Sequence, residues 1–428
     1  MPRFVLVSRA HRALALLVGL AALGAGVLGV LRWFEGARGR EAEDKAALER
    51  ALAAAPDDAR LHHRLGQWEQ FSLADGDFQQ ALAHFRRATE LNPHESAYWL
   101  DLADAWLLAG DAAAAEAAAQ EALQVDPRTP RTLWRVGNFW LRTAEPARAF
   151  PYFRRVLETD PQLTPLVVQV CHRTFRDPEI LVRELLPPEP PFLLAYLRQL
   201  VREGEAEAPA AVRVWEKLVE TGRPFEARDV LFYLDYMIRT RHLPEAVKAW
   251  GDLRRRGLLP GPAASPELLH NPDLGAPILG GGFDWRIEPV AHVSVSLGPG
   301  RRGERPPAVV IRFSGEVNLH YRGFYQYAVV EPNRRYRFQA WLRTDNITTE
   351  SGPRLEVADV YGGGRVLARS PGMVGTSEWA PEEVEFASGP ETRLVRVGLT
   401  RLPSRRLGGE IRGVVLAGEF SLQPLRGR

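Results

Sequence analysis

The side chains best suited to chemistry in this chain lie on a predicted strand at residues 336–343. Side chains alternate along a strand, so the apolar residues of this segment face one way and Gln339, Trp341 and Arg343 face the other. An indole ring between planar polar groups can stack on the apolar face of a sugar while its neighbours bind the hydroxyls. Packing against the last helical repeat would need the same kind of surface, so both interpretations stay open.

Strand parity adds further outward-facing candidates for this glycan face. They are Arg312, Tyr325, Tyr327 and Glu356. Packing explains each of them as well as ligand contact does. The module is therefore expected to bind either a glycan or a second protein.

Few residues could support catalysis, and their spacing does not group them into a catalytic site. The GGGF segment at 280–283 lacks the lysine and hydroxyl residue of a phosphate loop. Glu356 and Asp359 are three residues apart on a strand, which puts them on opposite faces. His320 has no partner that the sequence identifies, and His62 and His63 point about 100° apart on a helix. We expect no enzyme, no cofactor and no metal site.

Short alternating runs separated by turn residues fill the carboxy-terminal region, 283–428, after a linker rich in proline and glycine at 261–282. The runs are HVSVSL, AVVIRF, YQYAVV, YRFQAWLR, RLEVADV, EEVEFA, RLVRVGLT and VVLAGEFSL. Eight or so strands without a helical pattern predict an all-β fold, either an antiparallel sandwich or a jelly roll.

The succession of a glutamine-led strand, a proline turn and a tyrosine-led strand, here Gln326, Pro332 and Tyr336, resembles jelly-roll carbohydrate-binding modules related to galactose-binding-like domains. The resemblance implies a sandwich that binds carbohydrate. That family commonly ends in an acidic strand that helps to hold structural calcium. This chain has GVVLAGEFSL there, so calcium is not expected.

Identities recur every 34 residues in the preceding region, as at Ala81, Ala115 and Ala149. Pro93, Pro127 and Pro161 recur with the same spacing. A fixed period of this length predicts stacked helical hairpins, with each proline ending a second helix. Small residues at 103, 115, 137 and 149 let two helices approach, and large ones at 99, 106, 140 and 153 fill the space beside them.

Residues 59–163 closely resemble tetratricopeptide repeats. We expect an all-α solenoid over 41–260 that becomes irregular after 163. In that family the concave face usually binds an extended peptide or a partner helix. Exposed candidates at polar positions of the first helices are His62, Gln67, Asp101, Asp104, Arg135 and Asn138, although solvated helix residues would look the same.

An uncharged run of about 19 residues, Ala13 to Leu31, follows a basic tail at 1–12. Its length suits one membrane-spanning helix, and an aromatic pair ends the segment, so we predict a transmembrane signal anchor at 13–34. A cleaved signal peptide is the alternative. We expect the amino terminus inside and the bulk of the protein outside the cytoplasm, in the periplasm or beyond.

The net charge of +2 over 428 residues is spread along the chain, which argues against nucleic acid as a partner. The one cysteine, Cys171, lies in an apolar helical stretch and is expected in the core. Together the patterns predict a multidomain, membrane-tethered, non-enzymatic scaffold: the repeats bind a protein, and the sandwich binds glycan or a second protein. Assembly or export of envelope polysaccharide is one setting. A lectin-like protein whose repeats serve only as a spacer is the alternative.

Overall fold

The computed structural model describes residues 44–72, 76–143, 145–260 and 268–425. The chain divides into two compact units between Pro187 and Pro188. The predicted basic tail and signal anchor lie outside the described residues. Among the described residues, no helix is both long enough and apolar enough to cross a bilayer.

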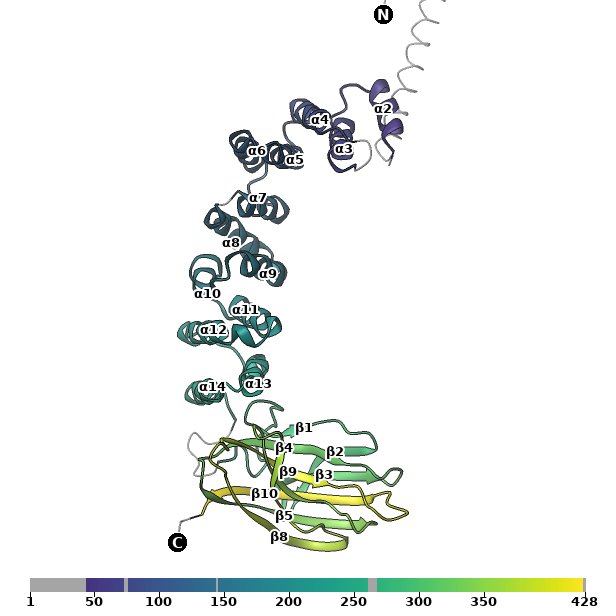
Figure 1. The fold of residues 1–428 in the computed structure, drawn as a ribbon, viewed down its shortest axis with the longest axis vertical. Coiled ribbons are helices and arrows are strands. Elements are labelled where there is room, and N and C mark those ends of the chain that lie inside the picture. Colours follow the sequence, from purple (N-terminus) through teal and green to yellow (C-terminus); the bar gives the residue numbers. More distant parts are fainter. Residues whose placement is uncertain (1–43, 73–75, 144, 261–267, 426–428) are drawn as a thin grey trace, which may run out of the picture. The chain divides into compact units, whose positions relative to one another are not determined.

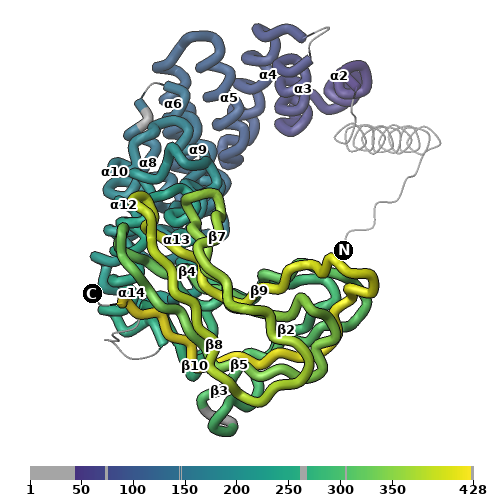
Figure 2. The backbone as a smooth tube through the Cα atoms, turned by 60° about the horizontal axis from the view of Figure 1, so that its bottom comes forward, coloured from purple at the N-terminus to yellow at the C-terminus, as the bar shows by residue number. Residues whose placement is uncertain are grey.

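Antiparallel helical hairpins build the described part of the first unit. Its helices are α2 (Lys45–Ala54), α3 (Ala59–Phe71), α4 (Phe78–Leu91), α5 (Ser96–Leu108), α6 (Ala112–Val125), α7 (Pro130–Arg142), α8 (Phe150–Thr159), α9 (Thr164–Phe175) and α10 (Pro178–Ile180). The pairs α3/α4, α5/α6 and α7/α8 pack as hairpins and follow one another along the chain (Figure 1, and for the first two pairs Figure 2). The predicted helical repeats are confirmed.

Local sequence signals set the limits of these helices. Asp58, Asp77 and Asp111 precede α3, α4 and α6, and each carboxylate accepts hydrogen bonds from backbone N–H groups of the first turn. Hairpin packing then depends on small residues. A Cβ atom on Gly137 of α7 would lie 2.7 Å from the ring of Phe153 on α8, so only glycine allows this approach. This contact is of the predicted small-against-large kind.

The second unit joins four more helices to a β-sandwich (Figure 1). The helices are α11 (Pro190–Glu203), α12 (Ala208–Glu220), α13 (Leu231–Arg239) and α14 (Leu243–Arg255). α11 packs on α12 and α13 on α14. Because the structure groups these helices with the sandwich, the second unit begins well before residue 261. The predicted domain limits at 41, 260 and 283 stay predictions.

Within residues 268–425, ten antiparallel strands form the sandwich, and its two sheets have the orders β1-β4-β9-β6-β7 and β2-β3-β10-β5-β8. We call them sheet A and sheet B. The strands are β1 (Arg286–Ile287), β2 (Val293–Gly300), β3 (Gly303–Ser314), β4 (Tyr321–Val329), β5 (Arg335–Ile347), β6 (Arg354–Asp359), β7 (Arg365–Arg369), β8 (Gly375–Ala387), β9 (Leu394–Arg401) and β10 (Arg412–Pro424). The sequence did not predict β1 and β7.

Strands β3 to β10 have the strand order of a jelly roll, with 3-10-5-8 in sheet B and 4-9-6-7 in sheet A. The core lies between the sheets. The parity predicted for β5 is confirmed, because Phe338, Ala340 and Leu342 are buried in this core while Gln339 and Trp341 are only partly covered.

Helices α13 and α14 pack directly against the sandwich. Asp235 of α13 forms an ion pair with Arg286 of β1 and accepts a hydrogen bond from the backbone N–H of Gly282 at 2.8 Å. Tyr361 donates its hydroxyl to the carbonyl of Ile238 at 2.9 Å. Polar contacts thus fix the last helical hairpin on the β module.

Candidate functional site

Four predicted partner-binding residues form one hydrogen-bonded network across the first helices of three hairpins. Asp101 on α5 accepts from Gln67 on α3 at 3.0 Å and from Arg135 on α7 at 2.5 Å. Arg135 also donates to Asp104 on α5 at 2.7 Å. Since the partners lie about one repeat apart in sequence, the network ties each repeat to the next.

This network is less exposed than the sequence predicted. The side chain of Asp101 is 16% exposed, and His63 contacts it at 2.5 Å. Burial acts to raise the pKa of Asp101, but the hydrogen bond with His63 and the charge of Arg135 outweigh burial and hold the pKa below its usual value. Asp101 is therefore an ionised link between repeats.

Two other predicted residues lie outside the network. A ring nitrogen of His62 lies 3.0 Å from one of His84 on α4, and its other ring nitrogen lies 3.0 Å from the carbonyl of Pro56. Asn138 donates to the carbonyl of Trp134 in its own helix at 2.8 Å. Polar type and helix position alone do not tell which side chains meet, because the register between helices decides it.

The predicted glycan face divides between the two sheets. Gln339, Trp341 and Arg343 on β5 and Arg312 on β3 point outward from sheet B. Tyr325 and Tyr327 on β4 and Glu356 on β6 point outward from sheet A. The single predicted face is therefore wrong. Parity shows whether a side chain faces the core, but it does not show which sheet the strand joins.

On sheet B, the ring of Trp341 is already partly covered. The guanidinium of Arg301 lies 3.9 Å from the centre of the indole ring. Glu419 holds Arg301 with two hydrogen bonds, of 3.1 and 3.0 Å. A sugar stacking on this face of the indole would have to displace a fixed cation.

On sheet A, one buried carboxylate has three arginine partners. Glu356 is 3% exposed and lies 2.7 Å from Arg369, 2.8 Å from Arg396 and 3.3 Å from Arg322. The three arginine side chains are 24–35% exposed. We call these four residues the arginine cluster. One carboxylate cannot neutralise three guanidiniums, so the cluster presents net positive charge to solvent.

Tyrosine rings continue this face beyond the arginine cluster. Arg396 also lies over the ring of Tyr325, 5.5 Å from its centre, and the ring of Tyr327 is 5.4 Å further along the strand. Tyr325 itself is buried and donates to Glu288 at 2.5 Å. In the part of the chain that the structure describes, no three His, Cys, Asp or Glu side chains are grouped so that they could hold a metal ion.

Comparisons with known proteins bear on the helical part. Two family models described as tetratricopeptide repeat match residues 72–133 and 109–164. Residues 72–164 consist of tetratricopeptide repeats. A search of curated proteins finds no match to the chain.

Solved structures resemble separate parts of the chain. The tailspike protein 4 enzymatically active domain of bacteriophage CBA120 is 12% identical, with a TM-score of 0.27, over 38% of this chain and 22% of that one. A CBM4 structure is 9% identical, with a TM-score of 0.28, over 37% of this chain and 99% of that one. MamA is 17% identical, with a TM-score of 0.29, over 46% of this chain and 92% of that one. Likenesses this weak carry no argument about function.

The first helices of the hairpins expose two large apolar residues that the sequence did not indicate. Phe71 is 71% exposed and Leu108 is 66% exposed, at the last positions of α3 and α5. Each lies four residues after a residue of the network, Gln67 or Asp104, and therefore on the same side of its helix. The sequence signal for this surface is an apolar residue four positions after a polar one, repeated at the ends of two successive first helices.

Arg142 occupies the corresponding position at the end of α7 and donates to Asp104. The first helices of three successive hairpins thus present Phe71, Leu108 and Arg142 in one row beside the polar network. We call these three residues the terminal row. It combines two exposed apolar side chains with a partly exposed cation.

Proposed function

We propose that this protein is a non-enzymatic scaffold whose tetratricopeptide repeats bind a segment of a partner protein through the terminal row. The observation that carries the proposal is the exposure of Phe71 and Leu108 at equivalent positions of successive repeats. Isolated exposed apolar residues are common, but two in register beside an ordered polar network form a surface that a partner's apolar side chains can cover. The network keeps the spacing of this surface fixed.

Photo-crosslinking in cells tests this part of the proposal. A benzoylphenylalanine residue is placed at position 71, at position 108 or, as a control, at the exposed position Glu121 on α6. Positions 71 and 108 should crosslink to the same polypeptide, and position 121 should not. Crosslinks scattered equally over all three positions would contradict a dedicated surface.

A pair of leucine variants separates binding from loss of folding. Leu108→Asp should reduce the yield of the crosslink from position 71 at least tenfold, because a carboxylate replaces an apolar contact. Leu166→Asp makes the same change on another exposed leucine of the first unit and should leave the yield unchanged.

For the sandwich, we propose that sheet A binds an acidic glycan at the arginine cluster. Arginine pairs with carboxylates through two parallel hydrogen bonds, and three guanidiniums share only one carboxylate here. Uronic acids supply the missing carboxylates on a polymer. The nearby tyrosines add apolar surface for sugar rings.

Binding of alginate oligosaccharides, compared with the same oligosaccharides after reduction of their carboxyl groups, tests this choice of ligand. Arg322→Gln removes the most distant arginine of the cluster and should weaken binding of the acidic form at least fivefold. Arg312→Gln removes an arginine from sheet B and is the matched control. If Trp341→Ala weakens binding and Arg322→Gln does not, the ligand lies on sheet B and the lectin-like alternative gains support.

The location of this scaffold is part of the same proposal. The apolar run Ala13 to Leu31 supports an anchor that holds both units outside the cytoplasm, where envelope glycans are found. A phosphatase reporter fused after Arg428 should be active only if its fusion point is exported. A reporter that works only in the cytoplasm would overturn the proposed orientation.

A further inference from the structure

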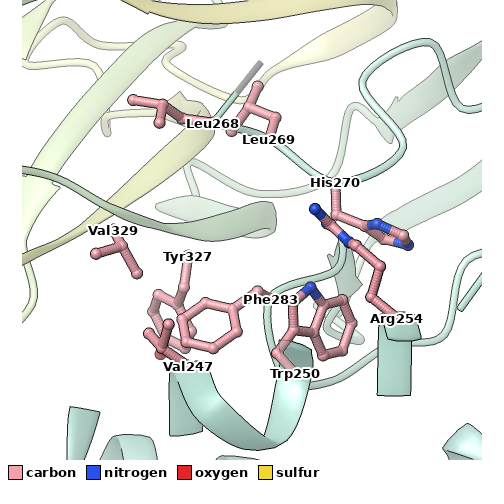
Figure 3. Close-up of a pocket in the computed structure, with 9 residues that line it drawn as sticks. All are labelled: Val247, Trp250, Arg254, Leu268, Leu269, His270, Phe283, Tyr327 and Val329. Atoms are coloured by element: carbon pink, nitrogen blue, oxygen red, sulfur yellow. The ribbon is translucent and has the colours of Figure 1, made fainter. Parts of the chain in front are cut away.

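A cavity of about 200 Å³ lies between α14 and the sandwich, within the second unit (Figure 3). Three aromatic side chains line it: Trp250 from α14, Phe283 from the loop before β1, and Tyr327 from β4. The rings of Trp250 and Phe283 meet edge to face, with centres 5.9 Å apart. These walls come from three separate segments of the chain.

The rim of the cavity is apolar and open to solvent. Val247, Leu268 and Val329 line it, and each is more than a third exposed. These three belong to the small set of large apolar residues that the described surface exposes. Their meeting at one opening indicates a place where an apolar group is covered on binding.

Two polar side chains of the cavity have no hydrogen-bond or ion-pair partner for a nitrogen atom among the described residues. His270 is 9% exposed, and its buried Nε2 atom has no hydrogen-bond partner within the described residues. The side chain of Arg254 forms no ion pair or hydrogen bond with any residue that the structure describes. Figure 3 shows its guanidinium beside the imidazole of His270.

The two groups differ in charge. Burial, with a further contribution from the charge of Arg254, lowers the pKa of His270 to about 4, so the imidazole is neutral at pH 7. Arg254 stays cationic. A neutral imidazole can present an N–H from Nε2, and with the guanidinium it forms a pair of donors beside an aromatic wall.

An unsatisfied buried polar atom is costly unless a ligand or solvent completes its hydrogen bonding. A carboxylate would accept from both groups and neutralise Arg254. An apolar cavity of about 150 Å³ is large enough for benzene, so about 200 Å³ accommodates a ring with a short acidic arm.

We propose that this cavity binds a small carboxylic acid with an aromatic body, whose ring lies among Trp250, Phe283 and Tyr327 and whose carboxylate meets Arg254 and His270. The terminal residue of a polypeptide carries the same chemistry as a free acid. This site shares Tyr327 with the tyrosines beside the arginine cluster, but its cationic group is Arg254, and it does not depend on the proposed glycan or protein binding.

Calorimetric titration of the full chain, purified in a nonionic detergent, tests the site with two matched probes. They are 3-phenylpropanoate and its amide, which differ in charge but hardly in shape. The acid should bind at least tenfold more tightly than the amide. Equal affinity for the acid and the amide would overturn the proposal. Failure to bind both the acid and a tetrapeptide that ends in phenylalanine with a free carboxylate would also overturn it.

Variants assign the binding to the cavity. Arg254→Gln should weaken binding of the acid at least tenfold, so that the acid no longer binds more tightly than the amide. The change carries little risk to folding because the side chain has no hydrogen-bond or ion-pair partner among the described residues. Arg228→Gln makes the same charge change at an exposed residue of the second unit and should bind like the unchanged protein. Unchanged affinity in Arg254→Gln would overturn the assignment.

A third probe, a tetrapeptide ending in phenylalanine with a free carboxylate, identifies the source of the ligand. Tighter binding of the peptide than of the free acid assigns the cavity to a polypeptide terminus. Tighter binding of the free acid assigns it to a small molecule. In either case, Arg254→Gln must reduce the affinity for the tighter-binding probe by the same factor to support the site.

Discussion

Glu356 and Asp284 are two carboxylates of the second unit that are almost inaccessible to solvent, and of these two only Glu356 has arginine partners in contact. Glu356 is surrounded by the arginine cluster. Asp284 is fully buried, and one of its oxygens accepts from the backbone N–H of Leu279 at 2.5 Å. Its other oxygen has no hydrogen-bond partner among the described residues. Burial therefore raises the pKa of Asp284 to about 6, against the opposing effect of backbone hydrogen bonds.

Asp284 should make stability fall as pH rises. Its pKa is 3.8 in the unfolded chain and about 6 when folded, so between these values the unfolded chain releases a proton that the folded protein keeps. The loss of unfolding free energy is complete above pH 6 and amounts to about 3 kcal/mol. Asp284→Asn removes this dependence. Urea denaturation should therefore show that the unfolding free energy of the variant rises relative to that of the unchanged protein between pH 3.5 and 7.

Asp345→Asn, at an exposed position of β5, is the control for this experiment. Its pH profile should run parallel to that of the unchanged protein. If the Asp284→Asn profile is parallel as well, the carboxyl is not the buried acid that its surroundings indicate.

At the scale of elements, close helix packing fixes the geometry of the repeats. The distance of 2.7 Å between a Cβ atom on Gly137 and the ring of Phe153 is shorter than side chains tolerate. Gly66 has the same relation to Phe85 in the hairpin of α3 and α4. The two hairpins thus use glycine at the same position for the same steric reason.

Gly137→Ala should destabilise the first unit by up to about 2 kcal/mol, because overpacking costs about 1–3 kcal/mol and the gain in helix propensity is only about 1 kcal/mol. Gly251→Ala is the matched control: this residue also lies inside a helix, and the nearest atom to its Cβ position is 3.4 Å away on the flexible side chain of Arg255. There the propensity gain should dominate. Thermal unfolding followed by circular dichroism measures both, and a stabilised Gly137→Ala protein would contradict the packing argument.

At the scale of the whole molecule, the last helices and the sandwich share polar contacts that a cut between them would break. Gln326 on β4 is fully buried and exchanges two hydrogen bonds with the backbone of His270, at 2.9 and 2.8 Å. Arg286 on β1 has its ion-pair partner, Asp235, on α13. The β-strands alone therefore do not complete their own hydrogen bonding.

A fragment of residues 188–428 should unfold cooperatively, whereas a fragment of residues 283–428 should melt at a clearly lower temperature or aggregate. The shorter fragment leaves the buried amide of Gln326 without partners, at about 1–3 kcal/mol for each lost hydrogen bond. It also uncovers Phe283. Near-ultraviolet circular dichroism of both fragments checks this, and equal melting temperatures would show that the helices add nothing to the sandwich.

The sequence by itself determined the features that depend on neighbours along the chain. The spacing of 34 residues predicts helical hairpins, and the alternation from Arg337 to Arg343 predicts which side chains of that strand face the core. Both follow from the pitch of one helix or the pleat of one strand, which a short segment contains in full. The small residue at position 137 likewise indicates that two helices approach closely there.

Only the tertiary structure decided which of these residues meet. Trp341 and Tyr325 both point outward, yet they lie on different sheets, because sheet membership depends on pairing with strands far away in sequence. Gln67 and Asp101 meet through the register of stacked helices. The cavity around His270 needs three distant segments together. Local periodicity sets the direction of a side chain, whereas long-range packing sets its neighbours.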